Sequence, residues 1–130
     1  RRRTGGRGLG LGVVVVVVQV LLLVSLDPMP DPGRGGIDPN DVESLAEAVA
    51  GHEALHLAGV MAVAPHPDTG VNPRAAFDRL YEISALVRAS WPNAREISAG
   101  MSSDLEAGVA AGATQVRIGG AILGERPPVQ

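Results

Sequence analysis

Two turns near the C-terminal end hold the residues best placed to do chemistry, Gly-Met-Ser at 100–102 and Gly-Gly at 119–120. Each follows a run typical of a buried strand, and its small residues leave backbone N–H groups free to meet an anion. Between the turns, Ser103 and Glu106 have the S-x-x-E spacing of a capping box, which predicts a helix starting at Ser103. The unpaired N–H groups of that helix favour a phosphate at the first turn. Two such corners are typical of the phosphate site of a β/α barrel, in the loops after its last two strands.

Arg117 is the charged residue of an otherwise small and apolar strand, expected over residues 114–118. A charged side chain is rarely buried without a partner, so its guanidinium needs an anion, a carbonyl or a ring acceptor. The residues leave two alternatives open. One is an ion pair with Asp104 or Glu106, and the other is contact with a bound ligand.

The histidines and the loop charges carry weaker signals. His52 and His56 are four residues apart, but Gly51 ends the helix that would place them on one face. We therefore expect them at the surface or in a loop, without a metal. His66 lies between two prolines after a strand end, where its side chain can border the site. Three further loop residues at the same end of the barrel are expected to be solvated: Asp31, Arg34 and Asp68.

Composition narrows the class of protein. At 130 residues, 45% of them apolar, the chain is one domain's worth, and with one Trp, one Tyr and one Phe its core must be aliphatic. The net charge of −3 gives no indication of nucleic-acid binding. The absence of cysteine fits a reducing compartment, and we predict a cytoplasmic location. All 11 basic residues are arginine, and there is no lysine and no initiator methionine. The sequence is therefore typical of the back half of something longer, or of mis-set gene boundaries.

The most apolar stretch, residues 13–26, has two interpretations. Basic residues precede about 18 mostly apolar positions over residues 9–26, as in a membrane anchor. Against an anchor stand the many β-branched valines and Gln19 in the middle. A strand buried on both faces needs only roughly six to eight of these residues. We favour a strand near residues 14–26 without membrane contact, preceded by an Arg/Gly-rich, disordered lead-in over residues 1–12.

The rest of the chain alternates helical and strand signals. Asp38-Pro39 and Asn72-Pro73 are cap-plus-proline pairs that predict two helix starts. Strands are expected near residues 57–64, 95–99 and 114–119, which gives the order β-α-β-α-β-α-β with parallel strands. This order predicts an α/β fold, a partial (β/α)8 TIM-type barrel of about four β/α units. In the first helix the expected apolar face consists of Val42, Leu45, Ala46 and Val49, and the helix ends at Gly51. In the second helix the expected face consists of Phe77, Leu80, Ile83 and Val87, and the helix ends at Trp91.

Several motifs together carry a resemblance to a known family. S-x-G-M-S-x-D-x-E-A, followed by A-G-A-T-x-V-R-I-G-x-A-I-x-G, is similar to the C-terminal signature of YggS/PROSC-type pyridoxal phosphate (PLP) homeostasis proteins. These are non-catalytic relatives of the alanine racemase barrel. The similarity extends back through SLDPMPDPGRGGIDPNDVESLAEAV and LAGVMAVAP, so it covers roughly residues 20–124. It implies a PLP-binding half-barrel over residues 13–124, followed by a tail over residues 125–130.

The resemblance also implies roles at the two turns. Ser102 donates its hydroxyl to the cofactor phosphate, and Arg117 approaches the pyridine nitrogen. A permanent cation there disfavours protonation of that nitrogen and weakens the ring as an electron sink, which suits a carrier better than a transaminase. The family usually has threonine at the position of Gly120, so one phosphate-binding hydroxyl is missing here. The implied cofactor-binding residues are Ser98, Gly100, Met101, Ser102, Arg117, Gly119 and Gly120, with no catalytic residue and no metal ligand.

The missing lysine separates this chain from the family pattern. The family holds PLP as a Schiff base on a lysine of its first barrel strand, so this chain is expected to bind PLP non-covalently at best. The resemblance then implies a non-enzymatic homeostasis protein that holds the cofactor and delivers it to apo-enzymes. Three other interpretations stay open: an enzyme half-barrel for a phosphorylated metabolite, with Asp27, His66 or Asp68 as acid or base; a membrane-anchored module using residues 9–26; and a fragment without a function of its own. The open sheet edges of a half-barrel also predict self-association.

Overall fold

A computed structural model of the chain describes residues 12–29, 31 and 33–119. Most of the expected lead-in over residues 1–12, the expected tail over residues 125–130, and Gly120 of the second turn lie outside the described residues.

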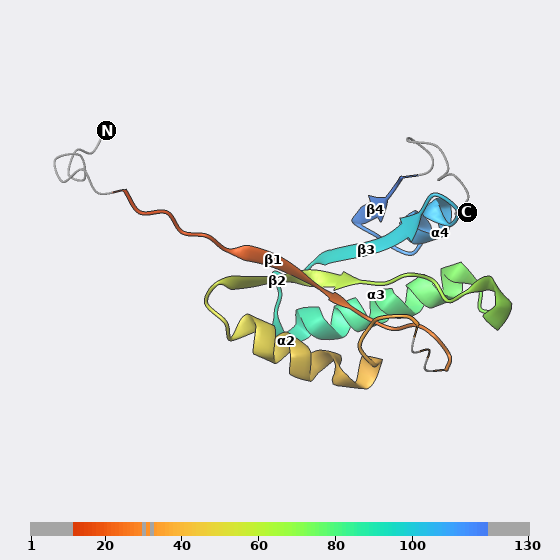
Figure 1. Cartoon of the computed structure of the whole chain (residues 1–130), viewed down its shortest axis with the longest axis horizontal. Coiled ribbons are helices and arrows are strands. Elements are labelled where there is room, and N and C mark those ends of the chain that lie inside the picture. The colour runs from red at the N-terminus through yellow and green to blue at the C-terminus, as the bar shows by residue number, and fades with distance from the viewer. Residues whose placement is uncertain (1–11, 30, 32, 120–130) are drawn as a thin grey trace.

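Four parallel strands form one sheet, in which strands that are neighbours in sequence are also neighbours in space (Figure 1). The strands are β1 (Val18–Leu23), β2 (Leu55–Met61), β3 (Glu96–Met101) and β4 (Gln115–Arg117). Along the chain, a helix follows each of the first three strands and precedes the next. The expected order is therefore confirmed, and with it the partial α/β barrel.

The helices begin where the cap-plus-proline pairs predict. The Asp38 carboxylate accepts the Asn40 N–H at 2.8 Å and starts a 3₁₀ turn, η1 (Pro39–Asp41), that leads into α2 (Val42–Ala50). The Asn72 side chain accepts the Arg74 N–H at 2.8 Å and starts α3 (Pro73–Ser90), which Trp91 ends. A second 3₁₀ turn, η2 (Pro67–Thr69), precedes α3, and the short helix α4 (Leu105–Ala110) joins β3 to β4.

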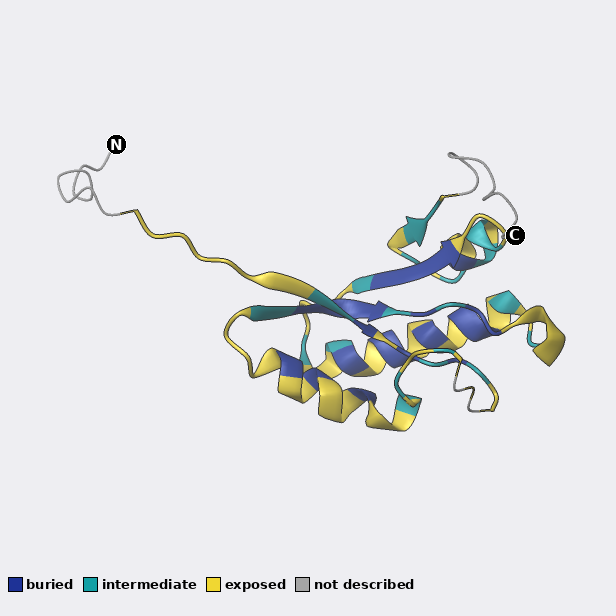
Figure 2. Ribbon diagram, in the orientation of Figure 1, coloured by how far each residue is buried: buried dark blue, intermediate teal, exposed yellow. Residues whose placement is uncertain are grey.

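The core lies between the sheet and the inward sides of α2 and α3, which run along the same side of β1 and β2 (Figure 2). The whole expected face of α3 is buried: Phe77, Leu80, Ile83 and Val87. On α2, Val42, Ala46 and Val49 are buried, but Leu45 is 36% exposed. The prediction for Leu45 is therefore wrong. Three small or medium side chains suffice to cover this flank of the sheet, and Leu45 lies at the rim of the helix face.

The apolar stretch over residues 13–26 forms a strand that is shorter than expected. Val18–Leu23 pair with β2, whereas Val13 to Val17 have no strand partner among the described residues and are exposed. None of the helices in the described part of the chain has both the length and the hydropathy that crossing a membrane requires.

The close pairing of β2 with β3 depends on Gly59. Its φ of +157° is one that other residues rarely adopt, and a Cβ at this position would overlap the Glu96 carbonyl of β3. The two strands approach closely here, where Gly59 lies opposite Glu96 in the parallel register.

Candidate functional site

The carboxyl ends of the four strands meet at one edge of the sheet, and both glycine turns follow strands at this edge. Met101 of β3 lies opposite Arg117 of β4 in the parallel register. The turn after β3 and the start of the turn after β4 are therefore neighbours at the same end of the sheet. Gly119 is exposed, and a Cβ there would meet no atom of the described residues within 4 Å.

The first turn is held by a carboxylate. Gly100 has φ +101°, a conformation that favours glycine. Just beyond it, the Met101 N–H donates to Asp104 Oδ1 at 2.7 Å, and the Asp104 N–H donates to the Met101 carbonyl at 3.1 Å. Ser102 is exposed within this turn, whereas Ser98 is buried on β3.

The capping-box prediction is wrong by two residues. Helix α4 begins at Leu105 with Asp104 as its N-cap residue, and no side chain makes a cap hydrogen bond to it. The physical reason is that the Asp104 carboxylate binds back to Met101, which fixes residues 102–104 as a turn and shortens the helix to 6 residues. One N–H group expected to meet a phosphate, that of Met101, is thus already occupied by a carboxylate.

Arg117 finds a carbonyl partner. Its Nη2 donates to the Ala62 carbonyl, just beyond β2, at 2.7 Å, and the side chain is half-buried. Its Nε is buried and has no hydrogen-bond partner in the described part of the chain. The alternative of an ion pair with Asp104 or Glu106 is wrong, since neither carboxylate lies within ion-pair distance of Arg117 among the described residues.

An open cavity of about 530 Å³ lies at this edge of the sheet. Met101, Ser103 and Asp104 of the first turn form one wall, and Arg34 with the segment that follows β2 forms another. Of the six implied binding residues that the structure describes, Met101 alone lines this cavity. Arg117 is held one step away, against the carbonyl of Ala62, which directly precedes the wall residue Val63.

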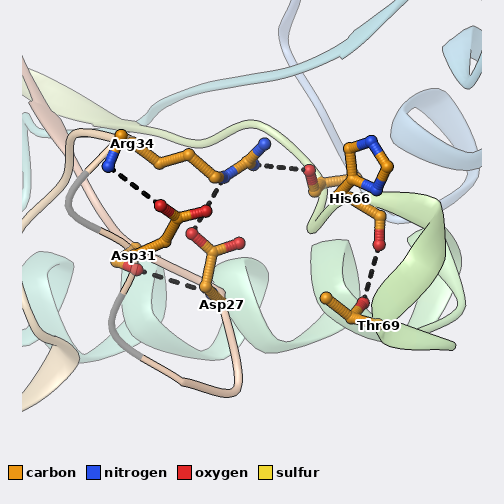
Figure 3. Close-up of polar contacts among 8 residues, drawn as sticks. Asp27, Asp31, Arg34, His66 and Thr69 are labelled. Carbon is orange, nitrogen blue, oxygen red and sulfur yellow. Dashed lines mark hydrogen bonds and ion pairs between the residues drawn. The ribbon is translucent and has the colours of Figure 1, made fainter.

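Arg34 differs from the prediction that it is solvated. Its side chain joins the segments that follow β1 and β2 (Figure 3). Its Nε donates to Asp27 Oδ2 at 2.9 Å, and its Nη2 donates to the Ala64 carbonyl at 2.9 Å. The Asp27 side chain is only 9% exposed, and its Oδ1 is buried without a hydrogen-bond partner in the described part of the chain. Sequence reasoning missed this contact because a seven-residue separation across a Pro/Gly-rich loop has no fixed geometry.

The remaining polar candidates have local roles. His66 Nδ1 accepts the Asp68 N–H at 3.1 Å, which caps η2, and His66 also lines the cavity, so it borders the edge as expected. His52 Nδ1 accepts the Ala54 N–H at 3.2 Å in the turn before β2. Asp31, which was expected to be solvated, is exposed and accepts the Gly33 N–H at 2.8 Å. As candidates for acid–base chemistry, Asp27 is engaged by Arg34, while His66 and Asp68 are exposed.

Comparisons with known proteins agree on one family. Residues 22–127 match the family described as alanine racemase, N-terminal domain. Proteins named pyridoxal phosphate homeostasis protein match at 43% identity over 99 residues in Mycobacterium tuberculosis (74% of this chain, 37% of the relative) and at 38% over 94 residues in Escherichia coli K12 (72% and 40%). Solved structures are also similar. One is an unknown protein from Bifidobacterium adolescentis (TM-score 0.70, 30% identity, 83% of this chain and 44% of that one). Another is PipY of Synechococcus elongatus PCC7942 with PLP bound (TM-score 0.65, 29% identity, 80% of this chain and 48% of that one). The chain thus spans less than half the length of these relatives.

Proposed function

The chain belongs to the alanine racemase N-terminal domain family, and from this premise we propose that it acts as a PLP homeostasis protein, a non-catalytic binding protein for the cofactor. The relatives named pyridoxal phosphate homeostasis protein confirm the resemblance to the YggS/PROSC-type proteins. The neighbouring PipY structure holds PLP, and this likeness supports the same ligand here.

The observation that carries the proposal is the pairing of Met101 with Arg117, which brings the turn after β3 beside the guanidinium of β4. The buried Arg117 Nε has no hydrogen-bond partner among the described residues, and none of their atoms lies within 4 Å of a Cβ placed at Gly119. A phosphorylated pyridine fits this combination, because it offers an anion to the turns and a ring acceptor to the guanidinium.

In this proposal each residue has a role in binding. Ser102 donates its hydroxyl to the phosphate, and the turns at Gly100 and Gly119 allow the phosphate to approach the backbone. Arg117, anchored through Nη2 to the Ala62 carbonyl, directs the rest of its guanidinium to the pyridine nitrogen. The remaining members of the proposed site are Ser98, Met101 and Gly120.

PLP supplies an aldehyde and an electron-withdrawing ring wherever it is bound. This chain has no lysine to capture the aldehyde, so the phosphate and the ring nitrogen must provide the affinity. Arg117 keeps a positive charge beside the ring nitrogen and disfavours its protonation. We therefore propose that the chain is not an enzyme, and that incubating it with PLP and D- or L-alanine gives no isomerisation or transamination above that of free PLP.

We also propose that the chain works in the cytoplasm, which the absence of cysteine supports. Apo-enzymes that need PLP receive it from this protein. Copies of the chain associate through the open edges of the sheet, which the exposed edge strand β1 supports.

Equilibrium dialysis of the chain against PLP and against pyridoxal, which lacks the phosphate, tests the proposed ligand. We expect saturable binding of PLP and binding of pyridoxal that is weaker by roughly a hundredfold, because charge-assisted hydrogen bonds to the phosphate are lost. Equal affinity for the two compounds, or no saturable binding of PLP, would contradict the proposal.

A further inference from the structure

The stretch that leads into β1, here called the valine arm (residues 13–17), leaves the sheet in line with the strand and runs away from the described helices (Figure 1). Figure 2 shows it exposed along its length. From Val13 to Val18 the residues are between 44% and 86% exposed. Six consecutive β-branched residues held in extended conformation strongly favour strand pairing.

The arm continues the free outer edge of β1. The strand is first in the sheet order, so its inner edge faces β2, and Ile37 covers only the end of its outer edge, through the Leu23 carbonyl and the Ser25 N–H. From Val13 to Leu22 no strand pairs with this outer edge in the part of the chain that the structure describes. The stretch also lacks the charges and prolines with which natural edge strands prevent pairing, since Gln19 is its one polar residue.

We infer that a second copy of this chain covers this edge, with the two arm–β1 strands antiparallel across a two-fold axis near Val18. A closed dimer needs a self-complementary surface, and antiparallel pairing of one strand with itself provides it. Each arm then lies beside the partner's β1, so both outer edges are covered at once and two four-stranded sheets become one continuous sheet. Across the pair, valine meets valine or leucine at nearly every position, and a net charge of −3 per chain opposes the contact only weakly.

This inference deepens the self-association proposed above and rests on it, but it is independent of the ligand. The mass of the particle and the binding of PLP are measured separately, so either result can fail without the other. Val13 to Val16 are 71–86% exposed among the described residues, so substitutions there should leave the fold intact, which circular dichroism checks.

Light scattering after size exclusion, across a hundredfold range of concentration, tests the inference. We expect the mass of two chains for the unchanged protein and a dissociation constant raised at least tenfold by Val16→Lys, because two added charges would lie within the paired strands. Val109→Lys is the matched control, since Val109 is a similarly exposed valine on α4 at 58% and should not change the mass. A single-chain mass throughout the range, or equal effects of the two variants, would overturn the inference.

Cross-linking tests the position of the axis. The chain has no cysteine, so Val18→Cys introduces one thiol per copy. Opposed antiparallel residues have Cα atoms within disulfide range, and mild oxidation by copper–phenanthroline should therefore link the two copies through residue 18. The control Val109→Cys should stay unlinked, and equal linking at both positions would count against the antiparallel pair.

Discussion

At the scale of single residues, the proposed site depends most on Arg117. Its Nη2 is held by the Ala62 carbonyl at 2.7 Å, so the guanidinium has a fixed place before any ligand binds. We expect Arg117→Gln to weaken PLP binding roughly tenfold to a hundredfold, the effect of losing one charge-assisted hydrogen bond. Isothermal titration with PLP measures this. The control is Arg95→Gln, an exposed arginine before β3 at the opposite end of the sheet, and an equal loss of affinity in both variants would contradict the role of Arg117.

Asp104 is expected to oppose the phosphate. Its carboxylate binds the Met101 N–H at 2.7 Å, so a negative charge lies at the turn proposed to hold the phosphate. Asp104→Asn keeps an oxygen acceptor for this N–H and removes the charge. Two like charges a few ångströms apart repel by on the order of 1 kcal/mol in water, so binding of inorganic phosphate should tighten by roughly fivefold.

The matched control is Glu106→Gln, which removes an exposed charge of the same sign from the first turn of α4. Phosphate titration followed by calorimetry should show a smaller gain for this variant. An affinity unchanged by Asp104→Asn would show that phosphate does not bind at the first turn.

Some residue contacts follow from sequence and others do not. Asn72 and Asp38 cap their turns as their types and spacing predict, because a cap bond spans only two residues. The same reasoning failed at Ser103, because the neighbouring Asp104 offered the backbone a competing carboxylate. Arg34 was missed because its partners, Asp27 and the Ala64 carbonyl, are brought to it by the sheet and not by local spacing.

At the scale of elements, Gly59 sets how closely β2 and β3 pair. In Gly59→Ala the new Cβ would overlap the Glu96 carbonyl, so the strands must separate. We expect a loss of roughly 2–3 kcal/mol in the free energy of unfolding, from overpacking and from the strained backbone. Urea unfolding followed by circular dichroism measures it.

Gly70→Ala isolates the steric part of this effect. Gly70 also has a positive φ, +73°, but a Cβ there would meet no atom of the described residues within 4 Å. It should cost about 1 kcal/mol, the backbone penalty alone. If both alanine variants lose the same stability, the close approach of β2 and β3 is not the cause.

Arg34 links two elements, and its removal tests that link. Arg34→Gln would leave Asp27, whose side chain is 9% exposed, without its ionic partner. Stranding a buried carboxylate costs about 1–3 kcal/mol, which urea unfolding should show. Arg74→Gln removes an ion pair with Asp78 whose partners are about half exposed, at 52% and 51%, and it should change stability little. A larger loss for Arg74→Gln than for Arg34→Gln would contradict the link.

The order of elements was predictable because each one carries its own signal. The face of α3 has helical period, and all four of its expected residues are buried. Strand ends were less predictable, since residues 13–26 are apolar at nearly every position and only the extent of β2 decides where pairing starts. Leu45 shows the same limit, because helical period names a face but not how far the sheet beneath it reaches.

At the scale of the whole molecule, the sheet has edges where a closed barrel has none. The strand order ends at β1 and β4 within the described residues, and the proposed site lies at the carboxyl end of β3 and β4, beside one of these edges. The proposed binding residues are thus gathered on the last two strands, whereas the resemblance assigns the amine of the family to its first strand. In the proposal, the chain holds a phosphate and a ring without supplying the group that makes the bond covalent.

This separation of binding from covalent capture gives a prediction for the entire chain. With 11 arginines and no lysine, these 130 residues offer no side-chain amine for an imine. After incubation with PLP and reduction by borohydride, mass spectrometry of peptides should find no pyridoxyl adduct on any side chain. Acetylation of the protein should leave PLP binding in equilibrium dialysis unchanged, because the proposed contacts at Ser102 and Arg117 involve no imine. If acetylation abolished the binding, imine formation would account for it and the proposed site would not.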